Sequence, residues 1–235
     1  MNNWSKMVAA VKSMQSTMTE VVEFLRQAAR VPAVAAVRGR LIFALDATAS
    51  RQPTWDRACQ LQGEMFAAVA EPGGLAIQLV WYRGYGEFKA EPWLIDSAEL
   101  QRRMTAVHCC GGLTQVGRVL QHALQETRRQ RVNALALVGD CLEEPVDPLC
   151  HFAGELGLLG VPVFAFQEGN DLKATQGFQE IARLTHGAYC RFDAGSARQL
   201  RELLRAVAVY AAGGHQALAT LGQQRELLCQ LTRSK

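Results

Sequence analysis

The chain has 235 residues, of which 49% are hydrophobic and 20% are charged, and its formal net charge is +3. These values are ordinary for a globular protein with one sizeable domain, and the small charge gives no indication of nucleic-acid binding. Seven cysteines at scattered positions, with no C-x-x-C pair, exclude a disulfide framework and indicate a reducing compartment. The basic cluster at 128–131 is interpreted as the solvated C-terminus of a helix, not as a nucleic-acid patch.

The N-terminal 38 residues form a segment of their own. Apolar residues recur at a spacing of seven, at Trp4, Val11, Met18 and Leu25. This spacing predicts an amphipathic helix over 1–30, which Pro32 ends. Docking of this helix on its own domain is the favoured interpretation. Pairing with a partner or with a second copy is the alternative, because sustained heptad spacing also indicates a coiled coil.

No part of the sequence indicates a membrane or a secreted protein. The first 14 residues lack the continuous apolar region and the cleavage pattern of a signal peptide. The apolar stretch over 203–214 is broken by Arg205 and is far shorter than a membrane span. We therefore expect a cytoplasmic protein without a membrane association.

Strand and helix patterns alternate over 39–212, which we take as one domain, followed by a polar C-terminal helix or tail over 213–235. The expected strands cover 40–46, 75–83, 87–93, 132–139, 161–166 and 188–192. The expected helices cover 53–70, 97–107, 114–129, 145–158, 174–185 and 196–212. Such alternation predicts an α/β fold with a mostly parallel sheet that is covered on both faces. The hairpin signal at 84–86 adds one antiparallel edge strand.

Oxygen-bearing side chains follow the first expected strand at alternate positions: Asp46, Thr48 and Ser50. Carboxylate and hydroxyl oxygens are the hard donors that Mg²⁺ prefers, and the carboxyl ends of parallel strands are where open α/β sheets bind ligands. The plain alternative for these three residues is that one of them is a helix N-cap, because Asp, Ser and Thr are favoured at that position.

Two further oxygen donors lie where the same site would need them. Thr114 stands at the start of an expected helix in the run G-G-L-T-Q-V-G-R-V-L, and Asp140 follows the apolar strand 132–139. Taken singly, Thr114 is also explained as an N-cap and Asp140 as a turn residue. All five oxygen donors together are better explained by one divalent metal site.

These three segments, D-x-T-x-S, G-x-T-x-x-G-x-x-L and G-D, resemble the loops of von Willebrand factor A (vWA) domains over about residues 39–212. In that family they form the metal-ion-dependent adhesion site (MIDAS), although the first motif usually has Ser where this chain has Thr48. The resemblance implies a three-layer, doubly wound fold, a Mg²⁺ or Mn²⁺ ion, and a protein partner that supplies a carboxylate to the metal. Gly112 and Glu143 are then expected on the partner-binding rim.

A Mg²⁺-dependent phosphatase is the alternative function. Haloacid-dehalogenase-type enzymes also have a nucleophilic Asp after the first strand, as Asp46 is placed, and a later G-D pair followed by a further acid. They need an acid–base Asp two residues after the nucleophile, where this chain has Thr48. They also need a Lys between the motifs, and Lys89, the one Lys there, falls in the expected edge strand. We therefore expect an interaction module and not an enzyme.

Overall fold

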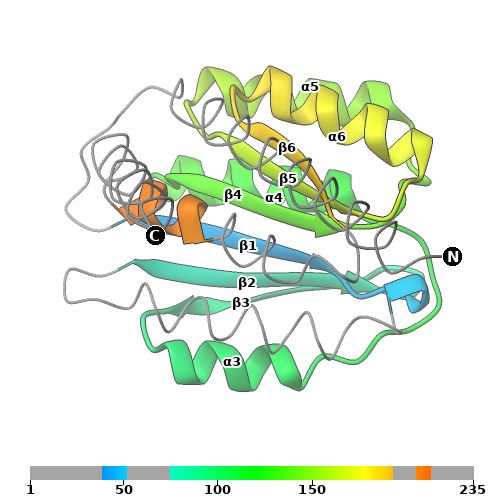
Figure 1. The fold of residues 1–235 in the computed structure, drawn as a ribbon. Helices are drawn as coiled ribbons and strands as arrows, with labels where there is room; N and C mark the ends of the chain where they lie inside the picture. Colours follow the sequence, from blue (N-terminus) through cyan, green and yellow to red (C-terminus); the bar gives the residue numbers. More distant parts are fainter. Residues whose placement is uncertain (1–38, 52–74, 193–204, 213–235) are drawn as a thin grey trace, which may run out of the picture.

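A six-stranded sheet forms the centre of the computed structural model, which describes residues 39–51, 75–192 and 205–212 (Figure 1). Its strands are β1 (Arg40–Asp46), β2 (Ala76–Arg83), β3 (Glu87–Leu94), β4 (Ala134–Gly139), β5 (Val163–Glu168) and β6 (Ala188–Phe192). Their order in the sheet is β3-β2-β1-β4-β5-β6. All neighbouring strands are parallel except β2 and β3, which form an antiparallel pair.

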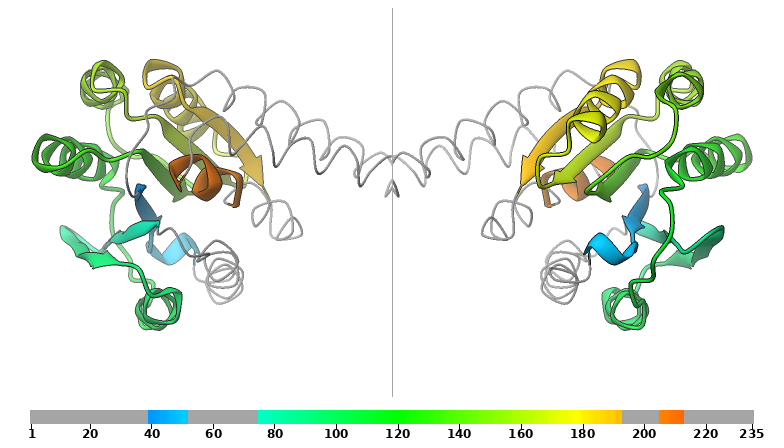
Figure 2. Two further views of the ribbon diagram at one scale, coloured as in Figure 1. Left: turned by 90° about the vertical axis from the view of Figure 1, so that its left-hand side faces the viewer. Right: turned by 90° about the vertical axis from the view of Figure 1, so that its right-hand side faces the viewer.

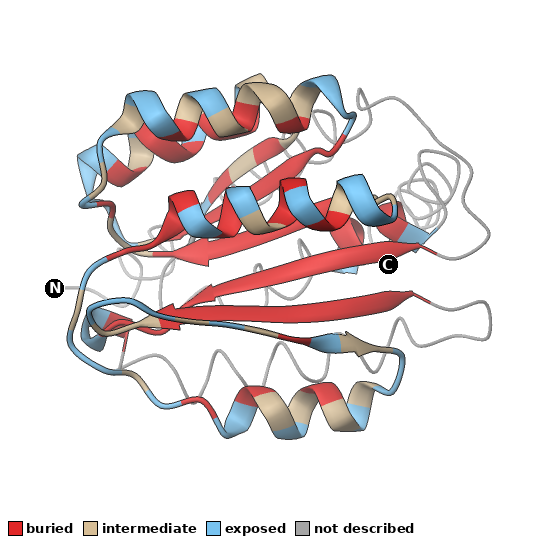
Figure 3. Ribbon diagram, turned by 180° about the vertical axis from the view of Figure 1, so that it is seen from behind, coloured by how far each residue is buried: buried red, intermediate tan, exposed pale blue. Residues whose placement is uncertain are grey.

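Helices cover both faces of this sheet and complete an α/β sandwich (Figures 1 and 2). On one face lie α4 (Val116–Arg129), α5 (Val146–Leu158) and α6 (Leu172–Leu184). On the other lie α3 (Ser97–Thr105) and a helical segment over 205–212. Each helix buries the stripe that faces the sheet and exposes the opposite one, as Figure 3 shows. The expected α/β fold with one antiparallel edge strand is therefore confirmed.

Strand β1 lies inside the sheet and is buried at every one of its seven positions. Because strand side chains alternate between faces, Ile42 and Ala44 pack against α4–α6, whereas Leu41 and Phe43 pack on the opposite side. By the same alternation, Asp46 lies on the same face of the sheet as Ile42 and Ala44. The hydrophobic pattern of β1 thus decides on which face of the sheet the carboxylate emerges.

Two helices begin at other residues than the sequence predicts. The helix expected from Thr114 begins at Val116, because the Thr114 side chain is used by another loop. The helix expected from 174 begins at Leu172, since the carboxylate of Asp171 accepts a hydrogen bond from the Ala174 N–H at 2.6 Å and caps it.

The strand expected at 161–166 lies two residues later, as β5. It extends over Gln167, whose buried side chain donates to the Asp171 carbonyl and accepts from the Thr175 and Tyr189 hydroxyls. Those contacts satisfy a polar residue inside the sheet.

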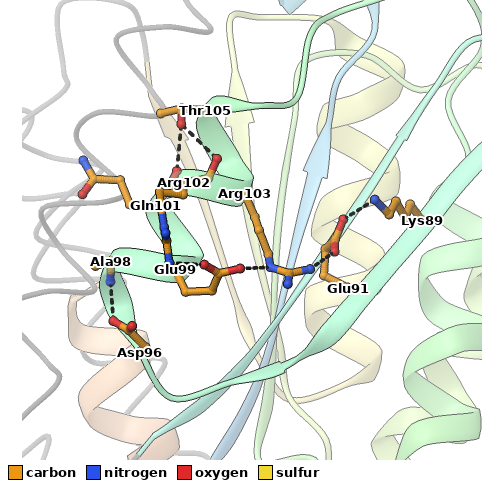
Figure 4. A network of polar contacts seen from close by, with 9 residues as sticks. All are labelled: Lys89, Glu91, Asp96, Ala98, Glu99, Gln101, Arg102, Arg103 and Thr105. Atoms are coloured by element: carbon orange, nitrogen blue, oxygen red, sulfur yellow. Dashed lines mark hydrogen bonds and ion pairs between the residues drawn. The ribbon is translucent and has the colours of Figure 1, made fainter.

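Helix α3 is attached to the edge strand β3 by a chain of ion pairs (Figure 4). Glu91 of β3 has a side chain that is 7% exposed, and it pairs with Lys89 at 2.8 Å and with Arg103 of α3. Arg103 also pairs with Glu99, at 2.7 Å. This network ties α3 to β3.

Several expectations fall outside the described residues. These are the N-terminal heptad helix, the segment after Pro32 that the sequence indicates as a linker to the domain, the helix expected at 53–70 and the C-terminal tail. The helix expected over 196–212 is described only for 205–212. None of the described helices combines the length and the apolar composition that a membrane span requires.

Candidate metal centre

Asp46 is fully buried at the end of β1, and both of its carboxylate oxygens accept hydrogen bonds. The Thr48 N–H donates to Oδ1 at 2.8 Å, and the hydroxyl of Tyr82, the residue paired with Asp46 in β2, donates to Oδ2 at 3.1 Å. Burial raises the pKa of Asp46 to about 6, although the hydrogen bonds from Thr48 oppose that shift. The nearby Asp140 carboxylate adds to the increase. This is a carboxylate whose charge is stabilised incompletely by the protein itself.

The D-x-T-x-S loop turns tightly after β1 and brings its two hydroxyls together. The Thr48 and Ser50 Oγ atoms are 3.1 Å apart, with Thr48 buried and Ser50 exposed. A short 3₁₀ turn follows at Ala49–Arg51. The buried Arg51 guanidinium pairs with Glu168 at the end of β5, Nε to Oε2 at 3.1 Å. That ion pair anchors the loop to a strand on the far side of β4.

Asp140 emerges directly after β4, beside β1, and comes close to Asp46. One ligand atom each from Asp46, Asp140 and Cys141 can be chosen so that all three lie within 4.8 Å of one another. The Asp140 Oδ1 atom is buried and has no hydrogen-bond partner within the described part of the chain. A buried acceptor left without a donor is costly, and a divalent cation would satisfy it. The residues present therefore fit a metal ion.

Thr114 is held against the loop that follows Asp140 by two reciprocal hydrogen bonds. The Thr114 N–H donates to Glu143 Oε2 at 2.8 Å, and the Glu143 N–H donates to Thr114 Oγ1 at 3.0 Å. Burial acts to raise the pKa of Glu143, but the hydrogen bonds from Thr114 outweigh it and lower that pKa. The structure thus attaches the G-x-T-x-x-G motif that contains Thr114 to the loop that follows the G-D motif.

In the sequence, Glu143 and Glu144 stand just before the helix expected from 145 and so also suit its acidic first turn; that interpretation is wrong. Helix α5 begins only at Val146. Glu144 instead accepts the N–H groups of Val116 at 2.6 Å and Gly117 at 2.8 Å, so it caps the N-terminus of α4 from outside that helix. Burial raises the pKa of Glu144 despite these two bonds.

The expected rim residues lie at the surface beside this centre. Glu143 is exposed, and its backbone carbonyl accepts a hydrogen bond from Lys173 Nζ at 2.7 Å. Gly112 is half-buried against the β2–β3 turn, where a Cβ would come within 2.1 Å of the Gly84 carbonyl oxygen. The Leu113 N–H donates to that same oxygen at 3.2 Å. The rim loop and the hairpin turn are therefore in close contact.

Sequence reasoning found the candidate ligands but not the residues that position them. Tyr82, Arg51 and Glu144 each act across elements that are far apart in the chain. The sequence does not mark Arg51 for its role, because a charged residue in a loop is ordinarily exposed to solvent.

Solved structures with this arrangement of strands and helices are numerous. A von Willebrand factor type A protein from Catenulispora acidiphila superposes with a TM-score of 0.60 at 17% identity, over 74% of this chain and 43% of that one. The SpRpn10 VWA domain gives 0.54 at 14% identity, over 72% and 94% of the two chains. The chain has a vWA fold.

At these low sequence identities, the similarity shows the fold alone. Proximal thread matrix protein 1 from the mussel byssus is another neighbour, with a TM-score of 0.58 at 17% identity, and one of its structures has a zinc-occupied MIDAS motif. The present chain matches 46% of the length of that protein and covers less than half of the Catenulispora protein. No protein-family model matches the chain, and no curated protein matches it in sequence.

Proposed function

We propose that this vWA domain is a metal-dependent protein-interaction module. Asp46 and Asp140 would hold a divalent cation, with hydroxyl oxygens from Thr48, Ser50 and Thr114. Such an oxygen set suits Mg²⁺ or Mn²⁺. When bound, the cation would supply a positive centre for a carboxylate of the partner. The vWA neighbours, one of them with zinc in its MIDAS motif, support a metal site at this edge of the fold.

The unpartnered Oδ1 of Asp140 is the observation that carries this proposal. It lies beside Asp46, whose own carboxylate is buried and has a raised pKa. Two carboxylates in one buried place repel each other unless a proton or a cation lies between them. A divalent cation between the two carboxylates would satisfy the Asp140 oxygen and offset their repulsion.

The surface around the centre suits an acidic and apolar partner segment. Tyr85, Leu113 and Leu172 are 88%, 52% and 77% exposed, and all three lie at the carboxyl end of the sheet. The cations Arg118 and Lys173 donate to carbonyl and amide oxygens in their hydrogen bonds, not to carboxylates. Apolar side chains of a partner would pack on these three residues, and its carboxylates would pair with the two cations.

The phosphatase alternative finds little support in the geometry. Thr48 lies two residues after Asp46, and its hydroxyl contacts Ser50, so no second carboxyl group stands in that loop. Lys89 pairs with Glu91 on the outer part of β3. We therefore propose binding without catalysis.

Calorimetry with the purified protein tests the metal site. Wild type is expected to bind Mg²⁺ or Mn²⁺ at one site, and Asp140→Ala to lose the heat because a ligand charge is removed. Glu180→Ala, on the exposed side of α6, serves as the control and should bind as wild type does. Equal binding by wild type and Asp140→Ala would remove the proposed centre. Mg²⁺-dependent aryl phosphate hydrolysis that is abolished in Asp46→Asn would favour the phosphatase instead.

A further inference from the structure

The thiol of Cys141 lies inside the proposed metal centre. Strand β4 ends at Gly139 and the chain bends at Asp140, so consecutive side chains no longer point to opposite faces. Both Asp140 and Cys141 can therefore face Asp46. Cys141 is half-buried, and the hydrogen bond found for its sulfur is a long one, Sγ to Glu143 Oε1 at 3.7 Å.

The spacing of these three groups matches one coordination sphere. Their chosen ligand atoms all lie within 4.8 Å of one another. Neighbouring ligands of a tetrahedral cation, with bonds of about 2.0 to 2.3 Å, are about 3.3 to 3.8 Å apart. Small side-chain movements would therefore let the Cys141 sulfur and the two carboxylates share a single ion.

We propose that Cys141 is a metal ligand and that its sulfur shifts the preference of the site from Mg²⁺ toward thiophilic divalent cations such as Zn²⁺ and Co²⁺. This inference rests on the proposed metal site. Thiolate is a soft ligand that suits zinc, whereas Mg²⁺ takes oxygen ligands almost exclusively. On binding, the S–H bond breaks, the sulfur electron pair forms the metal–sulfur bond, and the proton is released to solvent.

Oxygen ligands alone already favour Zn²⁺ and Co²⁺ over Mn²⁺ to some degree. The role of Cys141 is therefore tested by a variant and not by the wild-type affinities. Cys141→Ser keeps the size of the side chain and replaces sulfur with oxygen. It is expected to weaken Zn²⁺ binding by at least about tenfold, and to leave Mg²⁺ binding nearly unchanged.

Cobalt spectroscopy gives a readout that does not depend on affinity. Co²⁺ bound to a thiolate shows a sulfur-to-metal charge-transfer absorption in the near ultraviolet, which oxygen ligands do not produce. Wild type loaded with Co²⁺ should show this band, and Cys141→Ser should lose it. Cys110→Ser is the matched control, because Cys110 is an exposed cysteine in the loop that pairs with Thr48. It should keep the band.

The possible results separate this inference from the proposed function. Co²⁺ binding by wild type without the sulfur band, and with equal Zn²⁺ affinity in Cys141→Ser, overturns the role of Cys141 but leaves the oxygen site. A band that is lost in Cys110→Ser and kept in Cys141→Ser also overturns it. Absence of any cation binding by wild type overturns both the sulfur ligand and the metal centre.

Discussion

At the scale of single residues, the buried carboxylate of Asp46 has an electrostatic cost in the metal-free protein. Its pKa is about 6 in the folded chain, against an ordinary value of 3.8. A group whose pKa is raised on folding binds its proton more tightly in the native state, so folding is favoured at low pH and opposed above the folded pKa. The cost of ionised Asp46 is on the order of 2 to 3 kcal/mol above pH 7.

Asp46→Asn is therefore expected to stabilise the protein in EDTA at pH 7.5. The amide has the same shape, can accept from Thr48 N–H and carries no charge to bury. The measurement is urea unfolding of both proteins between pH 4 and 8. The advantage of the variant should shrink as the pH falls through 6 and nearly vanish near pH 4, where native wild type is protonated. A variant that is less stable than wild type at every pH would contradict the buried-charge argument.

Asp46 and Asp140 could be predicted from the sequence because each follows a hydrophobic run that reads as a buried strand. The run before Asp46 and the run before Asp140 become adjacent parallel strands, so both acids reach one edge of the sheet. The partners of these acids could not be found in this way. Tyr82 lies within an apolar strand pattern, where nothing marks its hydroxyl as the donor to Asp46. Such a contact depends on the register between β1 and β2.

At the scale of elements, the acid that caps α4 comes from the loop after β4. Helix α4 has no side-chain cap of its own at Gln115, and Glu144 accepts from its first N–H groups. Propensity arguments look for a cap next to the helix. They cannot find one that is 28 residues away, so the sequence alone does not indicate that Glu144 caps α4.

Glu144→Ala is expected to lower the free energy of unfolding by about 1 to 2 kcal/mol, because two N–H groups at the α4 N-terminus lose their acceptor. Thermal unfolding followed by circular dichroism measures this effect. Glu180→Ala, which breaks an exposed pair with Arg183, is the control and should change the stability by much less. Equal losses in the two variants would show that the capping bonds contribute little.

Element boundaries were predicted well where the hydrophobic pattern alone decides them, as for β1 and β6. They were displaced where a polar side chain decides them. Asp171 starts α6 two residues early, and satisfied polar contacts at Gln167 extend β5. Thr114 is kept out of α4 by its bonds with Glu143.

At the scale of the whole molecule, the proposed metal centre would draw its ligands from the loops that follow β1 and β4 and from the loop that precedes α4. A cation bound there would stabilise only the folded chain, where the ligands are together. The expected gain is about 2.7 kcal/mol at a metal concentration 100 times the dissociation constant. Differential scanning calorimetry should show the melting temperature rise with metal in wild type and stay constant in Asp140→Ala. A parallel rise in both would place the stabilising ion elsewhere.

The edge strand β3 also limits how this molecule can associate with other chains through its sheet. Its sequence, EFKAEPWL, has charged residues at Glu87, Lys89 and Glu91, and Pro92 offers no N–H to a neighbouring strand. Such an edge discourages the sheet from growing by addition of a foreign strand, which is the common route to amyloid-like stacking. In a crowded cell, the molecule can then expose apolar residues such as Tyr85 and Leu113 near the loops, while the backbone of β3 stays protected from the addition of a foreign strand.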